Sequence, residues 1–451
     1  MKRKFHSNSI LKKGIAALML GGLAFGSYVA VSSLTATPLA LVPDQPEREA
    51  TPLESDFVAF EGQFSLFALA SDPVDLGYTS DDALFILSSH GYITRATKDA
   101  DGLRQMNQFA KLDIENADWS KGASALAFHP NYDKPMTRGY GKFYLSVAEK
   151  AGSGDVDFGT TLRENHQEVV YEFQAEDPSA DTFTGTFREV LRISQPNEGI
   201  NIADLSFDSR GLLYIAIGDA EGILSDAADN LTSVYGKVLR IDPIPTADGD
   251  YSIPSRNPFV NNTSALDEIW AYGINRPSSV TVDRLRDWVT ISDSQPDSIQ
   301  EINLSKTGAE NFSWDSAIYG AESEVEPTPA HVEYVADQDA GLSVGSVFYR
   351  GAAFPELQGK LIFADKGGNL FMVDPATSAE VEPVKALNLR DALPAEVLAI
   401  KNGPSGELFA LCANHKIYEL GNESFRANNA PLETTVMAGH DDHDTWLNPI
   451  R

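Results

Sequence analysis

Short apolar runs broken by glycine and aspartate recur along most of the chain. Each run follows a Gly or Asp, is rich in β-branched and aromatic side chains, and stops at a small or polar residue. Runs of this length between turn-forming residues are typical of β-strands. The six copies are "DALFILSSHGYITRA" from Asp82, "GKFYLSVA" from Gly141, "GLLYIAIGD" from Gly211, "DWVTISDS" from Asp287, "GKLIFADKGGNLFMVD" from Gly359 and "GELFALCANHKIYEL" from Gly406.

The recurrence predicts an all-β fold, a six-bladed β-propeller from about residue 56 to residue 421. Repeats of a few short antiparallel strands at this spacing are the sequence signature of propeller blades. The hairpin within Gly199–Gly222 is expected to form the inner part of one blade, with Gly199–Asp204 entering it near the central channel. After the N-terminal segment, Ile223–Tyr235 is the one stretch whose pattern is compatible with a helix instead of a β-strand.

The two ends of the chain are expected to lie outside the propeller. Residues 1–36 combine a basic start with an apolar Gly/Ala-rich stretch, which is typical of a signal peptide or of an uncleaved N-terminal anchor. Residues 37–55 are rich in Pro and Glu and predict a linker, and residues 422–451 form an acidic C-terminal tail. The protein is therefore expected to be exported, periplasmic or secreted, with membrane contact only through an uncleaved N-terminal segment.

Charge and cysteine content exclude some classes of function. The 451 residues carry a formal net charge of −30, which repels nucleic acid and anionic membranes and keeps an exported protein soluble. The only cysteine, Cys412, lies in an apolar run. It allows neither a disulfide framework nor a cysteine metal site within one chain, and we expect it to be a buried core residue.

Several segments, in chain order, resemble the glucose/sorbosone dehydrogenase family, the soluble quinoprotein sugar dehydrogenases. The resemblance is carried by "GASALAFHPNYDKPMTRGYGKFYLSV", "LSFDSRGLLYIAIGD", "YGKVLRIDP", "IPSRNPF", "EIWAYGINRP", "IQEINLSKTGAENFSW" and "VFYRGAAFPELQGKLIFAD". It implies a six-bladed propeller that binds pyrroloquinoline quinone and calcium and oxidises a sugar or another alcohol. In that family, a histidine of the enzyme takes the proton of the sugar hydroxyl while the quinone takes the hydride.

The resemblance places an isoleucine where this histidine should be. The family's base histidine stands five residues before the Leu that is Leu205 here, so its position is Ile200. No catalytic residue is therefore assigned. Glu198 and Asp204 are conceivable substitutes, although solvation in a loop is the simpler interpretation of both. The family's substrate-contacting glutamine falls at Ser120.

The resemblance also implies cofactor and metal contacts. Lys366 and Arg390 fall where the family holds the carboxylates of the quinone, and the family's Arg-Asn pair is reversed as Asn275-Arg276. For calcium, the matching positions are the carbonyls of Gln295 and Pro296 at the cofactor site, and the Glu301 carboxylate with the Phe312 carbonyl at a structural site.

The histidines are further candidates for a replacement base or for metal ligands. His129 in "AFHP" is expected to be structural, and His90 and His166 are weak candidates for a replacement base. The stretch His440–Asp444 has metal-compatible residues, but a solvated acidic tail is the simpler interpretation.

Three functions stay open at this point. The first is a quinone- and calcium-dependent sugar or alcohol dehydrogenase with an altered substrate site. The second is a catalytically inactive exported propeller that binds a glycan, a peptide or an envelope partner. The third is a calcium-dependent hydrolase of the lactonase type, for which no His, Asp and Asn set can be assembled from the motifs.

Overall fold

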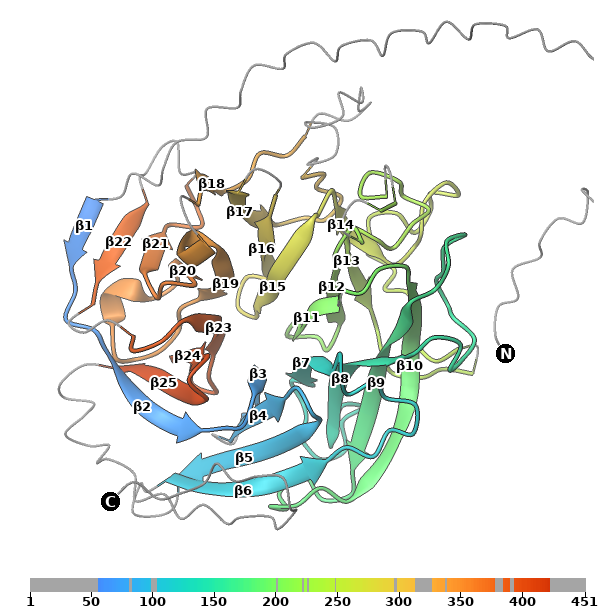
Figure 1. Ribbon diagram of the computed structural model, residues 1–451, viewed down its shortest axis with the longest axis horizontal. Coiled ribbons are helices and arrows are strands. Elements are labelled where there is room, and N and C mark those ends of the chain that lie inside the picture. The colour runs from blue at the N-terminus through green and yellow to red at the C-terminus, as the bar shows by residue number, and fades with distance from the viewer. Residues whose placement is uncertain are drawn as a thin grey trace, which may run out of the picture. The chain divides into compact units, whose positions relative to one another are not determined.

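The six predicted strand-rich repeats fold into six antiparallel blades around one axis, and the computed structural model is a six-bladed β-propeller (Figure 1). It describes residues 56–421 apart from 81–82, 99–103, 200–201, 221–222, 225–226, 248, 296–297, 313–326, 337–338, 378–383 and 390–392. Each of the six sequence repeats contains the second strand of a blade, which confirms the predicted fold and the number of blades. Where the structure describes Ile223–Tyr235 it has turns, so no helix forms there.

Four blades are simple four-stranded meanders that start at the propeller axis. The first two consist of β3 (Pro73–Tyr78), β4 (Leu84–Ser88), β5 (Tyr92–Lys98) and β6 (Arg104–Lys111), then β7 (Ala123–Phe128), β8 (Lys142–Lys150), β9 (His166–Ala175) and β10 (Gly185–Gln195). The next two consist of β11 (Ile202–Phe207), β12 (Leu213–Ile217), β13 (Lys237–Ile241) and β14 (Ile269–Tyr272), then β15 (Arg276–Asp283), β16 (Trp288–Ser294), β17 (Ile299–Ser305) and β18 (Val332–Val335).

The last two blades close the ring with strands from the start of the described chain. The fifth blade comprises β19 (Ser343–Phe348), β20 (Leu361–Asp365), β21 (Leu370–Val373) and β22 (Lys385–Asn388), with β1 (Asp56–Ala59) added parallel to β22. The sixth comprises β23 (Val397–Asn402), β24 (Leu408–Cys412) and β25 (Lys416–Gly421), and β2 (Gln63–Leu69) pairs antiparallel with β25 as its outer strand. One short 3₁₀ turn, Asp339–Gly341, precedes β19, and another, Pro355–Leu357, lies between β19 and β20.

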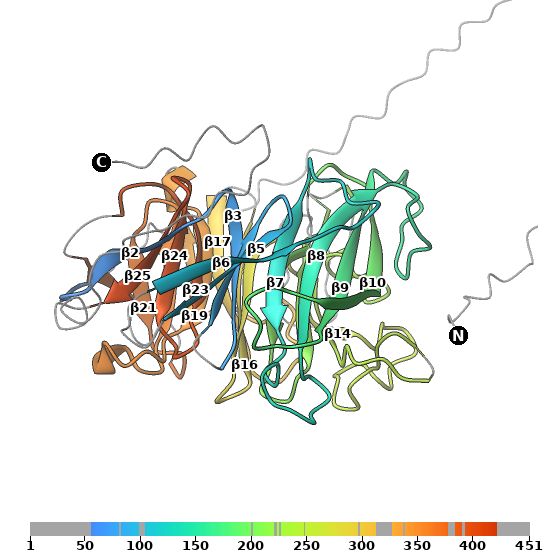
Figure 2. The same ribbon diagram turned by 90° about the horizontal axis from the view of Figure 1, so that it is seen from below.

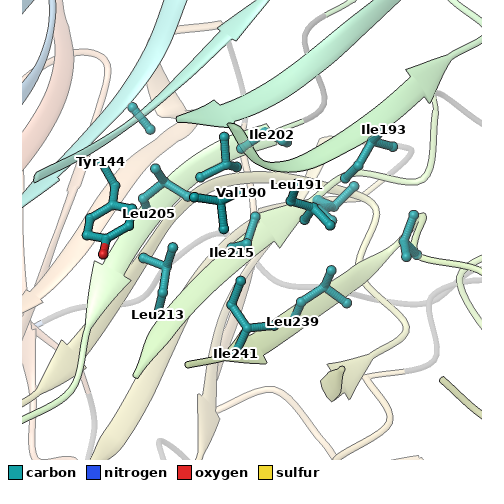
Figure 3. Close-up of a cluster of buried hydrophobic side chains, with 14 of the residues drawn as sticks. Tyr144, Val190, Leu191, Ile193, Ile202, Leu205, Leu213, Ile215, Leu239 and Ile241 are labelled. Atoms are coloured by element: carbon teal, nitrogen blue, oxygen red, sulfur yellow. The ribbon is translucent and has the colours of Figure 1, made fainter. Parts of the chain in front are cut away.

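Neighbouring blades lie face to face (Figure 2), and buried apolar side chains fill the contacts between them. Between the second and third blades, Tyr144 and Val190 contact a cluster from β11, β12 and β13, which includes Leu205, Ile215 and Leu239 (Figure 3). β12 is buried on both faces, which explains why its sequence is a continuous apolar run rather than an alternating one. Cys412 is buried in the sixth blade as expected, and burial raises the pKa of its thiol to about 11.

The inner strands meet at a buried ion cluster on the propeller axis, which we call the axial triad: Lys401, Asp75 and Asp204. The ammonium of Lys401 lies 2.9 Å from Asp75 Oδ1 and 2.7 Å from Asp204 Oδ1. Asp75 Oδ2 accepts the backbone N–H of Leu126 on β7, and Asp204 Oδ2 accepts that of Val280 on β15. The triad therefore links β23, β3, β11, β7 and β15 across the channel.

Burial is the largest influence on the pKa of Asp75 and of Lys401. It raises the pKa of Asp75 to about 6, against the opposing effect of the Lys401 charge. Burial lowers the pKa of Lys401, but the two carboxylates outweigh that effect and hold the pKa above its usual value. Asp204 is thus a buried ion-pair partner, and its interpretation as a solvated loop residue is wrong.

Removing the cation of the triad should destabilise the whole propeller. Lys401→Met leaves two buried carboxylates facing each other, and breaking a buried ion pair on one side typically costs about 3–5 kcal/mol. We expect a loss of this size in the free energy of unfolding, measured by denaturant titration at pH 7. The control Lys360→Met breaks a partly exposed pair with Asp374 and should cost about 1 kcal/mol or less. Equal losses in the two variants would contradict the central role of the triad.

Candidate functional site

The rim at which the inner strands begin collects most of the residues that the sequence singled out. A blade of four antiparallel strands ends on the side where it started, so the next inner strand begins on that same side. We call this side the entrance rim. Asn275 and Arg276 lie at the start of β15, Gln295 follows β16 and Lys366 follows β20, so all four come to the entrance rim. Ile200, Pro296 and Arg390 lie outside the described residues.

Asn275 links the third and fourth blades through its backbone. Its N–H donates to Asp293 Oδ2 at 2.9 Å, and its carbonyl accepts the N–H of Asp219 at 2.9 Å. Asn275 is buried, whereas Arg276 beside it is exposed to solvent at the rim. The reversed Asn-Arg pair therefore buries the amide and leaves only the guanidinium accessible to a ligand.

A cluster of two carboxylates and two amides lies directly behind this link. We call Asp293, Gln295, Glu301 and Asn303 the carboxylate–amide cluster. Asp293 on β16 is paired with Glu301 on β17, so both side chains occupy one face of the blade. The amide nitrogen of Gln295 donates to Asp293 Oδ2 at 3.0 Å and to Glu301 Oε2 at 2.9 Å, and that of Asn303 donates to Glu301 Oε2 at 3.1 Å.

The cluster is buried and holds more oxygen atoms than N–H donors. All four side chains are at most 3% exposed. Within the described part of the chain, no group donates a hydrogen bond to three of their oxygens, Asp293 Oδ1, Gln295 Oε1 and Asn303 Oδ1. Burial, and next the charge of Glu301, raise the pKa of Asp293 well above its usual value. Buried oxygens without donors are rare in folded proteins, because each costs the solvation it has lost.

This composition fits a hard divalent cation better than a transition metal. Calcium takes six to eight oxygens from carboxylates, amides and carbonyls. In the described part of the chain, no three His, Cys, Asp or Glu side chains lie close enough together to bind a metal, so a cation here would also need amide or carbonyl oxygens. Phe312, the expected carbonyl ligand, is buried in the apolar contact between the third and fourth blades, and its N–H donates to the Tyr272 carbonyl.

Lys366, one of the cations expected to hold the quinone, already pairs with the carboxylate of Glu396. Lys366 Nζ lies 2.9 Å from Glu396 Oε1, and both side chains are partly exposed at the entrance rim. A carboxylate ligand would have to compete with Glu396 for the ammonium. Of the described residues expected to contact the quinone, Arg276 and Lys366 thus offer one exposed and one paired cation.

The remaining candidates around the rim do not form a catalytic pair. Ser120 Oγ donates to Asp118, and the Glu198 carbonyl accepts the ammonium of Lys121 at 2.8 Å. His166 is fully buried, with Nε2 3.7 Å from Glu168 Oε1, so it cannot reach a substrate in this conformation. His90 is exposed at the same rim, with Nδ1 3.8 Å from Asp72 Oδ2.

His129 lies in a structural environment at the opposite end of the channel, as expected. Its ring packs against Phe207 with centroids 5.3 Å apart, and Nδ1 accepts the N–H of Asn131. Burial, followed by the positive charge of Arg284, lowers its pKa to about 4. The imidazole is therefore neutral at physiological pH.

Sequence reasoning did not single out Asp293 or Lys401. A signal was present for both, since each is a charged residue inside a strand-like apolar run, "DWVTISDS" and "VLAIKN". A charge at such a position is buried and must find a partner, but the sequence does not say which.

Comparison with known proteins identifies the family. The profile of the family described as Glucose / Sorbosone dehydrogenase matches residues 70–418. The chain belongs to the glucose/sorbosone dehydrogenase family. Within this family it resembles the Hedgehog-interacting protein of Mus musculus, with 27% identity over 373 residues that cover 78% of this chain and 50% of that protein. The aldose sugar dehydrogenase YliI of Escherichia coli (strain K12) is 28% identical over 239 residues, covering 51% of this chain and 61% of the relative.

Solved structures agree with the propeller fold of the family. The apo-form of the soluble aldose sugar dehydrogenase from Escherichia coli superposes with a TM-score of 0.58 at 19% identity, covering 80% of this chain and 98% of that one. The form of the aldose sugar dehydrogenase from Streptomyces coelicolor with bound PQQ gives 0.54 at 16% identity, with 80% and 98% covered. This chain spans about half the length of the Hedgehog-interacting proteins it matches. No helix in the described part of this family member is long and apolar enough to cross a membrane.

The raised pKa of Asp293 should give this family member a measurable pH dependence. The folded chain keeps a proton on Asp293 that the unfolded chain releases near about pH 4. In the presence of a chelator, the free energy of unfolding should therefore fall as pH rises above about 4. Asp293→Asn should remove part of this fall, measured as melting temperature between pH 4 and 8. Identical slopes for the wild type and the variant would show that Asp293 ionises freely in the folded chain.

Proposed function

We propose that this glucose/sorbosone dehydrogenase family member is an exported calcium-binding propeller that holds a polar ligand at its entrance rim and oxidises sugars weakly or not at all. The observation that carries the proposal is the set of three buried oxygens without donors on Asp293, Gln295 and Asn303. Beside the buried Glu301 carboxylate, they offer what calcium requires: several hard oxygens and negative charge. A bound cation would coordinate these oxygens and remove the cost of keeping Asp293 ionised.

Two features support ligand binding without efficient oxidation: the rim has cationic side chains, and the sequence has no histidine at the position expected for the proton acceptor. Arg276 is exposed, and Lys366 can exchange Glu396 for another acidic group. The position expected for the proton-accepting histidine is Ile200, whose side chain cannot accept a proton. Asp204 is committed to Lys401 and so cannot replace it. Two of the curated relatives are named for interaction with another protein, a precedent within the family for a binding role.

A quinone-dependent dehydrogenase is the second candidate, because the family and the Streptomyces coelicolor structure with bound PQQ favour it. When bound, the quinone would supply the hydride acceptor. In this chain Arg276 and Lys366 are the described cations for its carboxylates, and Lys366 is paired with Glu396. These two cations match the carboxylates of the quinone incompletely, because one of them is already paired. The lactonase alternative ranks last, because no His, Asp and Asn set can be assembled from the sequence motifs.

Calcium should stabilise the folded chain through the carboxylate–amide cluster. A ligand that binds only the folded state at a hundred times its Kd adds about 2.7 kcal/mol. We expect the melting temperature of the chelator-treated protein to rise on addition of calcium, and Glu301→Gln to lose most of this rise. The control Asp374→Asn removes a partly exposed carboxylate that pairs with Lys360 and should keep it. If chelation and calcium leave the wild-type melting temperature unchanged, the calcium proposal fails.

Sugar oxidation should be separable from quinone binding. A positioned general base contributes about 10²- to 10⁴-fold to a rate, so we expect little reduction of a dye acceptor with glucose, even in protein loaded with pyrroloquinoline quinone and calcium. Ile200→His should raise this activity, whereas Ile223→His, at an exposed isoleucine, should not. Binding is followed by quinone absorbance, and turnover by dye reduction over a panel of sugars. Robust wild-type glucose oxidation would establish the dehydrogenase instead.

A further inference from the structure

The opposite end of the channel, where the inner strands finish, contains a cavity that the proposed function does not use. It has a volume of about 60 Å³ and is lined by the second halves of β3, β7, β11 and β15 and by the end of β23. We call this end the exit rim. The lining residues that matter here are Tyr78, Ser206, Thr281, Arg284 and Lys401.

Arg284 is the unusual residue of this cavity. Its guanidinium lies over the ring of Tyr78, 5.0 Å from the centroid, and Nε donates to the Phe207 carbonyl at 3.3 Å. Among the described residues it has no carboxylate partner, although acidic side chains outnumber basic ones 65 to 35 in this chain. Its neighbours at the exit rim are paired: Arg210 with Asp208, and Arg286 and Arg350 with Asp283.

The cavity also contains hydroxyl groups able to face an anion. Ser206 Oγ accepts the N–H of Val282 at 3.3 Å, which leaves its own hydroxyl proton available to donate. The hydroxyl-bearing Thr281 lines the same space. A guanidinium offers two parallel N–H donors that match the two oxygens of a carboxylate, a fit that a spherical anion such as chloride does not have.

The axial triad sets the charge next to the cavity. With both carboxylates ionised, Lys401, Asp75 and Asp204 carry one net negative charge, which opposes an incoming anion. Asp75 faces Lys401 from β23, Asp204 from β11 and the Leu126 N–H from β7. Because burial raises the pKa of Asp75 to about 6, mild acid removes this negative charge. Anion binding should therefore strengthen as pH falls from 8 to 5.5.

We propose that the exit rim holds a binding site for a small carboxylate, with Arg284 as its main ligand and the hydroxyls of Ser206 and Thr281 as further donors. The site lies at the other end of the channel from the entrance rim and is independent of calcium and quinone. The carboxylate can be a free small acid or the acidic end of a larger ligand that extends from the rim.

The test uses sodium acetate as the probe on the full chain, with sodium chloride at equal ionic strength as the reference. Binding is measured by calorimetry and by melting temperature at pH 5.5 and pH 8. We expect acetate to bind more tightly at pH 5.5, and Arg284→Gln to weaken it at least about tenfold. Arg284→Lys should also weaken it, because lysine keeps the charge and loses the paired donors. Arg210→Gln, at a paired arginine of the same rim, should leave binding unchanged.

Three results would overturn the proposal. One is the absence of any acetate effect beyond that of chloride in the wild-type chain. Another is equal acetate binding by the wild type and Arg284→Gln, and the third is tighter binding at pH 8 than at pH 5.5. If Arg284→Gln does not fold, Arg284→Lys and Thr281→Val provide the comparison, and unchanged binding in both would likewise overturn it.

Discussion

One largely buried lysine, Lys401, ties together five of the six inner strands of this propeller. Lys401 reaches Asp75 and Asp204 across the axis, and these carboxylates accept backbone N–H groups from two further blades. An ion cluster in a dry interior costs solvation and is tolerated only when each charge has close partners. The cluster satisfies that condition only when all five strands lie in one arrangement, which makes it a constraint on the whole ring.

The two ends of the channel differ in chemistry because of this constraint. Above the triad, the starts of the inner strands bring Asn275, Arg276 and Lys366 to one rim, with the carboxylate–amide cluster directly behind. Below it, the strand ends carry arginines, of which Arg284 faces the cavity without a carboxylate partner among the described residues. A single scaffold can thus offer an oxygen-rich cation site at one end and an anion site at the other.

The resemblance to the family is stronger in the segments that form the propeller than at the positions expected for the active site. The described segments that match the family form strands and turns of the propeller. At the positions where the resemblance implies oxidation chemistry, the sequence has Ile200, Ser120 and a reversed Asn275-Arg276 pair. Gln295, which was expected to offer its carbonyl to calcium at the cofactor site, donates its side-chain amide to two buried carboxylates. Blade packing tolerates such changes because functional groups lie on rims and loops.

The fold class and the number of blades follow from local patterns in the sequence, because strand period and turn residues are local properties. The sequence also placed Cys412 in the core and His129 in a structural role. The pairing of the buried charges, by contrast, depends on contacts between residues far apart in the chain. Asp204 looked like a loop carboxylate beside a missing base, yet it pairs with Lys401, 197 residues further along the chain. Asp293 and Glu301 face each other because β16 and β17 pair within one blade, and burial together with the charge of Glu301 raises the pKa of Asp293. No local sequence pattern encodes that burial.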